Sequence, residues 1–173
     1  IIVGSANWRT YAYDLAGKLL WDEVCWAHTP TCGTTFDLDG DGTREVIMGN
    51  SYTQAVVYSA IGKVIGNGGG SGHAGPTAVA CADLDGNGKG EIVVGDRAGR
   101  IWFQEWNGRK LPTHATGSEI TDIAIADLDG DGTLESVVSS SNYLIYVFDA
   151  NGAPAWQINP LTMAYDIAIA NVI

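Results

Sequence analysis

The sequence predicts an all-β fold, a β-propeller of four-stranded antiparallel blades, on three observations. An acidic loop recurs at regular spacing, an apolar run of strand length follows each copy, and a glycine-centred hairpin ends each unit. Repeats of about 45 residues that each hold four strands are typical of propeller blades. We expect about four blades that form part of a larger propeller; the alternative is a closed four-bladed ring.

The acidic loop has three complete copies: DLDGDGTRE (37–45), DLDGNGKGE (83–91) and DLDGDGTLE (127–135). A fourth copy begins at residues 165–173, where YDIAIANVI resembles TDIAIADLD (121–129) with Asn171 in place of Asp127. Residues 1–4 have the composition of a strand interior, so we expect a piece of a longer chain. The sequence therefore predicts one domain, 1–173, with repeat units of approximately 1–45, 46–91, 92–135 and 136–173.

Each unit supplies its strands in the same order. Strand one (TTFD, AVACAD, DIAIAD, DIAIAN) leads into the acidic loop, and strand two is an apolar run (IIVGS, VIMGN, IVVGD, SVVSS). Strands three and four flank a glycine that permits the positive φ of a tight turn: Gly17, Gly62, Gly108 and Gly152. Alternate alanines in strand one suit the crowded axis of a propeller.

The charge distribution excludes some partners. The formal net charge is −11 with only 9 Lys and Arg, so no nucleic-acid partner is expected, because phosphate binding needs clustered cations. The three loops carry four, three and four of the 20 carboxylates. Carboxylates this close repel one another unless a cation joins them. No apolar run reaches the roughly 20 residues of a membrane-spanning helix.

The pattern D-x-D-x-D-G-x-x-E predicts one Ca²⁺ per complete loop, about three in all. Calcium takes six to eight oxygen ligands, which side chains at loop positions 1, 3, 5 and 9 and the backbone carbonyl at position 7 can supply. The expected ligands are Asp37, Asp39, Asp41, Thr43 and Glu45; Asp83, Asp85, Asn87, Lys89 and Glu91; and Asp127, Asp129, Asp131, Thr133 and Glu135.

The loop has two other possible interpretations. An EF-hand needs a bidentate Glu at position 12, where this chain has Met48, Val94 and Val138. A solvated Asp-Gly turn is the plainer alternative, but three copies in register, each with Glu at position 9, favour metal binding. Asn87 lowers the charge of the second loop, which we expect to be the weakest site.

These loops, between strands one and two of a blade, resemble the FG-GAP/VCBS repeats of integrin α-subunit propellers and many secreted bacterial proteins. The resemblance covers essentially the whole chain and implies a calcium-binding propeller in an extracellular, secreted or cell-surface setting. The Phe-Gly and Gly-Ala-Pro marks of integrins are not clear here, so no integrin assignment follows. A weaker resemblance is to eight-bladed rhamnogalacturonan lyase propellers.

Cys25 and Cys32 flank the short segment WAHTPT and are candidates for a disulfide, which would indicate an oxidising compartment. The alternative is two unrelated small residues. Cys81 lies in an apolar strand and is expected to be a buried thiol.

The loop face opposite the acidic loops is the expected site for a glycan or protein ligand. Its candidate residues are Trp8, Trp26, His28, Tyr52, His73 and Tyr143, with His114 in a further interblade segment. Aromatic packing between blades and loop hydrogen bonding are the alternatives for these side chains.

The function expected is therefore an extracellular binding, adhesion or assembly module. A fragment of a calcium-dependent polysaccharide lyase and a self-assembling subunit of a surface filament remain alternatives. No catalytic residues are identified, since metal-bound carboxylates stay ionised and suit general acid catalysis poorly.

Overall fold

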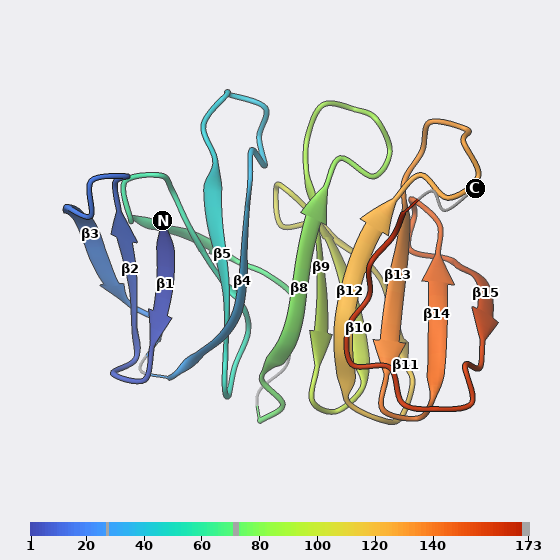
Figure 1. Ribbon diagram of the computed structural model, residues 1–173. Coiled ribbons are helices and arrows are strands. Elements are labelled where there is room, and N and C mark those ends of the chain that lie inside the picture. The colour runs from blue at the N-terminus through green and yellow to red at the C-terminus, as the bar shows by residue number, and fades with distance from the viewer. Residues whose placement is uncertain (27, 71–72, 171–173) are drawn as a thin grey trace.

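The computed structural model describes residues 1–26, 28–70 and 73–170, which form four antiparallel sheets that follow one another in chain order (Figure 1). The first sheet has three strands and the others have four. Their bounds are β1 Ile2–Ser5, β2 Arg9–Tyr13, β3 Leu19–Val24; β4 Pro30–Phe36, β5 Glu45–Asn50, β6 Val56–Tyr58, β7 Val64–Asn67; β8 Pro76–Ala82, β9 Glu91–Asp96, β10 Arg100–Glu105, β11 Lys110–Ala115; and β12 Ile120–Ala126, β13 Glu135–Ser140, β14 Leu144–Phe148, β15 Pro154–Ile158.

The predicted strand order within a blade is confirmed. In each complete sheet, neighbouring strands along the chain pair antiparallel, as in β4-β5-β6-β7. The sheets are out of phase with the sequence repeat by one strand, because each complete sheet starts with strand one while each repeat unit starts with strand two. Among the described residues, no helix is long and apolar enough to cross a membrane.

The closed four-bladed ring is not observed. Residues 164–170 lie beside β12, where Thr121 Oγ1 donates to the Ala164 carbonyl at 2.7 Å and the Ile167 amide donates to Asp122 Oδ2 at 2.7 Å. Within the described part of the chain, β1 pairs only with β2. The arrangement is an open row of blades, as in part of a larger propeller.

A repeated threonine links the innermost strands of adjacent blades. Thr31 Oγ1 donates to the Pro76 carbonyl at 2.6 Å, and Thr77 Oγ1 donates to the Ile120 carbonyl at 2.6 Å. Thr121 makes the same bond to residue 164, as described above. The second, third and fourth blades are therefore each hydrogen-bonded, at the start of their first strand, to the segment that follows.

Strand two approaches the next blade at a glycine. A Cβ built on Gly49 would lie 2.8 Å from the Pro76 side chain, and one on Gly95 would lie 2.3 Å from Ile120. Such distances leave no room for a side chain without a shift of the neighbouring blade. The Gly in VIMGN and IVVGD thus sets the spacing between blades.

The apolar core lies between the sheets rather than in one centre. One cluster joins the second and third sheets through Leu38, Val57 and Ile92, and another joins the third and fourth through Phe103, Ile123 and Phe148. These side chains are at most 8% exposed. Burial of apolar area between neighbours is the main stabilisation of such stacked repeats.

The expected disulfide is not formed: Cys25, Cys32 and Cys81 are all free thiols. Cys25 is fully buried beside Tyr58, Asn50 and Thr10, while the Cys32 sulfur lies over Gly49. Burial raises the pKa of both thiols, that of Cys32 to about 11. The cysteines therefore give no support to an oxidising compartment.

Candidate metal centres and the opposite loop face

Each acidic loop is folded around its first aspartate. In the first loop, Asp37 Oδ1 accepts from the Gly40 amide at 2.9 Å and Asp37 Oδ2 accepts from the Gly42 amide at 2.8 Å. Gly40 and Gly42 have φ of 76° and 88°, in the left-handed region that glycine adopts at little cost. Positions 4 and 6 have this left-handed conformation in all three loops.

The glutamate at position 9 returns to the start of its loop. Glu45 Oε2 accepts from the Leu38 amide at 2.9 Å, and Glu91 and Glu135 accept from the amides of Leu84 and Leu128 at 2.9 and 2.8 Å. In each glutamate the bond uses Oε2, and Oε1 does not take part in it. Strand two, which begins at this glutamate, thereby fixes one carboxylate against the preceding loop.

The structure brings three carboxylates together in every loop, with one oxygen of each within 4.8 Å of one oxygen of the other two. The loops share positions 1 and 3, and the third member is Asp at position 5 in the first loop but Glu at position 9 in the others. The three groups are Asp37, Asp39 and Asp41; Asp83, Asp85 and Glu91; and Asp127, Asp129 and Glu135.

The second loop contains a buried carboxylate oxygen without a partner. Glu91 is 2% exposed, and its Oε1 accepts no hydrogen bond from the described residues. Burial, followed by the charges of Asp85 and Asp83, raises the pKa of Glu91 to about 7. Burial likewise raises the pKa of Glu45. An oxygen that is buried, charged and unpaired is costly, and a cation beside Asp83 and Asp85 would satisfy it.

Some predicted ligand positions have other contacts. Asn87 Oδ1 accepts from the Lys89 amide at 2.9 Å, just as Asp41 Oδ1 accepts from Thr43 at 2.7 Å. The side chain of Lys89 leaves its own loop: its Nζ donates to the Asp39 carbonyl at 2.9 Å and lies 3.9 Å from the centroid of a Trp106 ring. Lys89 thus joins two blades, which its loop sequence did not indicate.

On the opposite loop face, three predicted ligand residues meet. The Tyr52 ring lies 4.8 Å from the His28 ring and 4.8 Å from the His73 ring. The segments before β4 and β8 supply the histidines, and the β5–β6 loop supplies the tyrosine. The structure therefore brings His28 and His73 together through Tyr52.

Aromatic residues on this face adopt a backbone conformation that favours glycine. Trp8 and Tyr143 have φ of 70° and 68°, and they occupy the place that Gly99, with φ of 80°, occupies in the third sheet. The same turn hydrogen bond holds all three amides, to Ser5, Ser140 and Asp96 respectively. Trp26 and His73 also have positive φ, at 47° and 76°.

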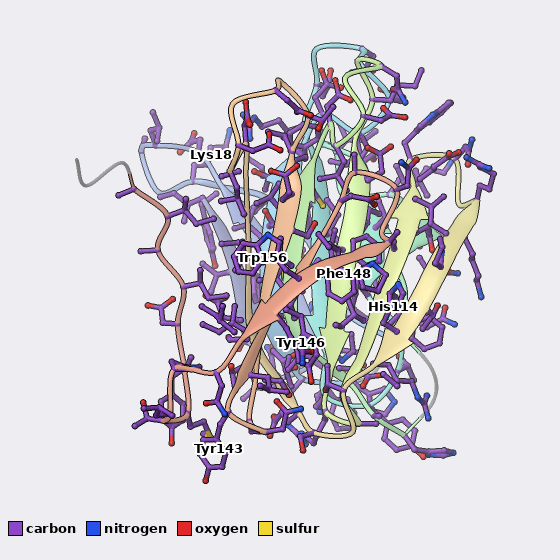
Figure 2. All side chains as sticks on the ribbon, turned by 90° about the vertical axis from the view of Figure 1, so that its right-hand side faces the viewer. Lys18, His114, Tyr143, Tyr146, Phe148 and Trp156 are labelled. Carbon is purple, nitrogen blue, oxygen red and sulfur yellow. The ribbon has the colours of Figure 1, made fainter. Side chains whose placement is uncertain are left out.

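A side-chain hydrogen bond from the preceding asparagine also holds each of these two turns. The amide group of Asn7, before Trp8, donates to the Tyr11 hydroxyl at 2.6 Å, and that of Asn142, before Tyr143, donates to the Tyr146 hydroxyl at 2.7 Å. Trp8 and Tyr143 are 52% and 53% exposed. Figure 2 shows Tyr143 at the loop end of its sheet, away from the partly buried Tyr146 and the buried Phe148. The sequence repeat N-aromatic-x-x-Y identifies this arrangement in both blades.

His114 does not lie in an interblade loop, as the sequence analysis expected, but within β11. Its Nε2 hydrogen-bonds the Gly152 carbonyl at 2.6 Å, and its ring lies 4.8 Å from that of Phe148 (Figure 2). The polar segment KLPTHA pairs with β10 from Lys110 to Ala115, and within it His114 pairs with Ile101. His114 is therefore a packing residue between blades.

Comparison with solved structures shows the same fold in proteins of low sequence identity. Sqt1 of Saccharomyces cerevisiae matches with a TM-score of 0.78 at 12% identity over 99% of this chain and 49% of its own. BamB of Moraxella catarrhalis matches with a TM-score of 0.66 at 17% identity over 91% and 44%. BBS1N, crystallised in complex with ARL6DN, matches with a TM-score of 0.67 at 14% identity over 91% and 49%.

The chain thus spans about half the length of these structural neighbours. No curated protein sequence matches significantly. A family model described as an FG-GAP-like repeat matches residues 37–94 and again 83–138, each span running from one acidic loop through the next and into strand two. These two matches cover more than half of the chain. The protein belongs to the family of FG-GAP-like repeat β-propellers.

Proposed function

We propose that this chain is a calcium-stabilised binding module of an extracellular or cell-surface protein, and that it binds a glycan on the loop face opposite the acidic loops. The observation that carries the proposal is the set of exposed aromatic residues on that face. Two of them, Trp8 and Tyr143, stand where a third blade has glycine.

The backbone of these two residues supports a functional role. A residue other than glycine in the left-handed region costs about 1 kcal/mol or more, and exposed rings return little of that cost through packing. Strain of this kind concentrates at binding sites. Exposed Trp and Tyr rings offer a flat apolar face and a polar edge, which suits stacking on a sugar ring.

Calcium has a structural role in this proposal. One ion in each loop would tie strand one to strand two and neutralise carboxylates that otherwise repel. Ions that bind only the folded state stabilise it by about 2.7 kcal/mol per site when the free concentration is 100 times Kd. Extracellular modules with weak sites need millimolar calcium, which is the basis for the proposed location.

A glycan array with the calcium-loaded protein tests the proposal. Trp8→Gly and Tyr143→Gly should each raise the free energy of unfolding by about 1 kcal/mol, because glycine relieves the strain, and yet weaken glycan binding. Arg97→Ala, which removes a charged side chain from the β9–β10 loop on the same face, serves as the control. Unchanged binding by both glycine variants would contradict the proposed ligand site.

A further inference from the structure

The three junctions between adjacent sheets are filled in different ways. At each junction the glycine of the following blade's β-hairpin turn faces the preceding blade: Gly62 at the first, Gly108 at the second and Gly152 at the third. All three have φ between 74° and 86° and the same turn hydrogen bond. The junctions can therefore be compared position by position.

Aromatic side chains cover this glycine at the first and third junctions. A Cβ built on Gly62 would lie 2.7 Å from the Trp21 ring, and one on Gly152 would lie 2.9 Å from Phe103. Each aromatic contact comes with a hydrogen bond from a ring nitrogen to a carbonyl of the turn. Trp21 Nε1 donates to Ala60 at 2.8 Å, and His114 Nε2 donates to Gly152 at 2.6 Å.

No described residue covers the glycine at the second junction. A Cβ built on Gly108 would meet none of the described atoms within 4 Å, and Gly108 is exposed where Gly62 and Gly152 are buried. The cause is one position of β7. In the second sheet, Gly66 pairs with Val57. At the same position of the first and fourth sheets, Trp21 pairs with Ala12 and Trp156 pairs with Val147. The second blade has glycine where the first and fourth have tryptophan.

A cleft of about 420 Å³ opens at this position, within the size range of ligand sites. Its apolar lining comes from Leu38, Val57 and Ile92, and the Trp106 ring, 40% exposed, contributes an aromatic surface. Gln104 closes one part of it, with its Nε2 bonded to the Asn67 carbonyl at 2.7 Å. The cleft is thus preformed by packing between two blades.

We propose that this cleft binds a tryptophan side chain of a polypeptide partner, in a site separate from the opposite loop face. The partner's indole would lie against Gly66 and Gly108 and donate its N–H to a carbonyl of the 105–109 turn, as Trp21 does within the chain at the first junction. Trp21 at the first junction and His114 at the third already make this contact, in which a ring nitrogen donates to a carbonyl of the turn. The same surface at the second junction therefore suits an aromatic ring that carries a hydrogen-bond donor.

Charge favours cationic residues beside that tryptophan. The described lining includes Asp39 and Glu45 and no lysine or arginine. Lys89 Nζ lies beside this lining, against the Trp106 ring and the Asp39 carbonyl. The two neighbouring acidic loops together carry seven carboxylates against Arg44 and Lys89, so the pair stays negative with one divalent cation bound in each loop. A peptide with lysines around tryptophan therefore complements the rim.

The test uses acetyl-Lys-Trp-Lys-amide made with 5-fluorotryptophan and follows its fluorine NMR signal as the whole chain is added in calcium. We expect saturable binding at one site. Gly66→Trp should weaken binding roughly tenfold or more, because its own indole fills the cleft. The matched control Gly66→Ala, whose Cβ would come no closer than 4.0 Å to another atom, should bind within about threefold of the unaltered chain.

Circular dichroism checks that each variant is folded, and Gly66→Leu replaces Gly66→Trp if the latter does not fold. Binding that Gly66→Trp or Gly66→Leu leaves unchanged, or no saturable binding at all, overturns the proposal. N-acetyl-5-fluorotryptophanamide tests the source of the ring. If this free compound binds as tightly as the peptide at about 100 mM salt, the polypeptide partner is wrong and the cleft takes a free heteroaromatic compound.

Discussion

Replacing Glu91 by glutamine should have opposite effects on the calcium-free and the calcium-bound protein. Glu91 is 2% exposed, its Oε1 has no partner among the described residues, and burial raises its pKa from 4.5 to about 7. A carboxyl group whose pKa rises on folding contributes stability that is present below pH 4.5 and is lost as the pH rises through about 7. The calcium-free protein should therefore become less stable across this range.

The size of the effect follows from the two pKa values. A difference of this size corresponds to about 3 kcal/mol at pH 8. Glutamine stays neutral and avoids that loss, although its buried amide group lacks partners at a cost of about 1–2 kcal/mol. We therefore expect Glu91→Gln to raise the free energy of unfolding in chelator by about 1–2 kcal/mol at pH 8 and to lower it at pH 4.5.

Urea unfolding at both pH values, in chelator and in calcium, measures the effect. In calcium, Glu91→Gln should lose stabilisation, because each tenfold loss of affinity at the second loop removes about 1.4 kcal/mol. Glu135→Gln is the matched control: Glu135 is more exposed, so the change in chelator should stay within about 0.5 kcal/mol. If Glu91→Gln destabilises the calcium-free protein at pH 8, the reasoning about an unpaired buried charge is refuted.

Asp85→Ala should cost less calcium affinity than Asp39→Ala in titration calorimetry, because Asn87 already weakens the second loop; the reverse order would contradict the ligand assignment. All three cysteines should resist iodoacetamide at pH 8 and become alkylated in urea without reductant, since burial raises their pKa; two thiols that stay unmodified would indicate a disulfide. Trp21→Ala should lower the free energy of unfolding by about 2–4 kcal/mol, and a change below 0.5 kcal/mol would contradict the role of Trp21 at the first junction.

The sequence predicted the features that depend on neighbouring residues along the chain. The acidic loop, the apolar strand behind it and the glycine of each β-hairpin turn are all local patterns with a fixed spacing. The return of Glu45, Glu91 and Glu135 to their loops was predictable for the same reason. Strand order within a blade then follows from tight turns, which join adjacent antiparallel strands.

Contacts between blades could not be predicted in this way. The role of His114 depends on which hairpin lies opposite β11, and the absence of a side chain at Gly66 has meaning only once Trp21 is seen at the same register. The disulfide prediction failed for a related reason. Spacing brought Cys25 and Cys32 near each other in sequence, but Cys25 is buried in the core beside Tyr58, and Cys32 lies over Gly49.

The proposed metal role is tested most directly by calcium titration of the chelator-treated protein in a calorimeter, with thermal unfolding recorded on the same samples. We predict three bound ions per chain, one for each complete acidic loop, and a higher melting temperature in calcium than in chelator. A titration without saturable heat, together with melting that calcium does not change, would contradict the proposal that these loops are calcium sites which hold the blades together.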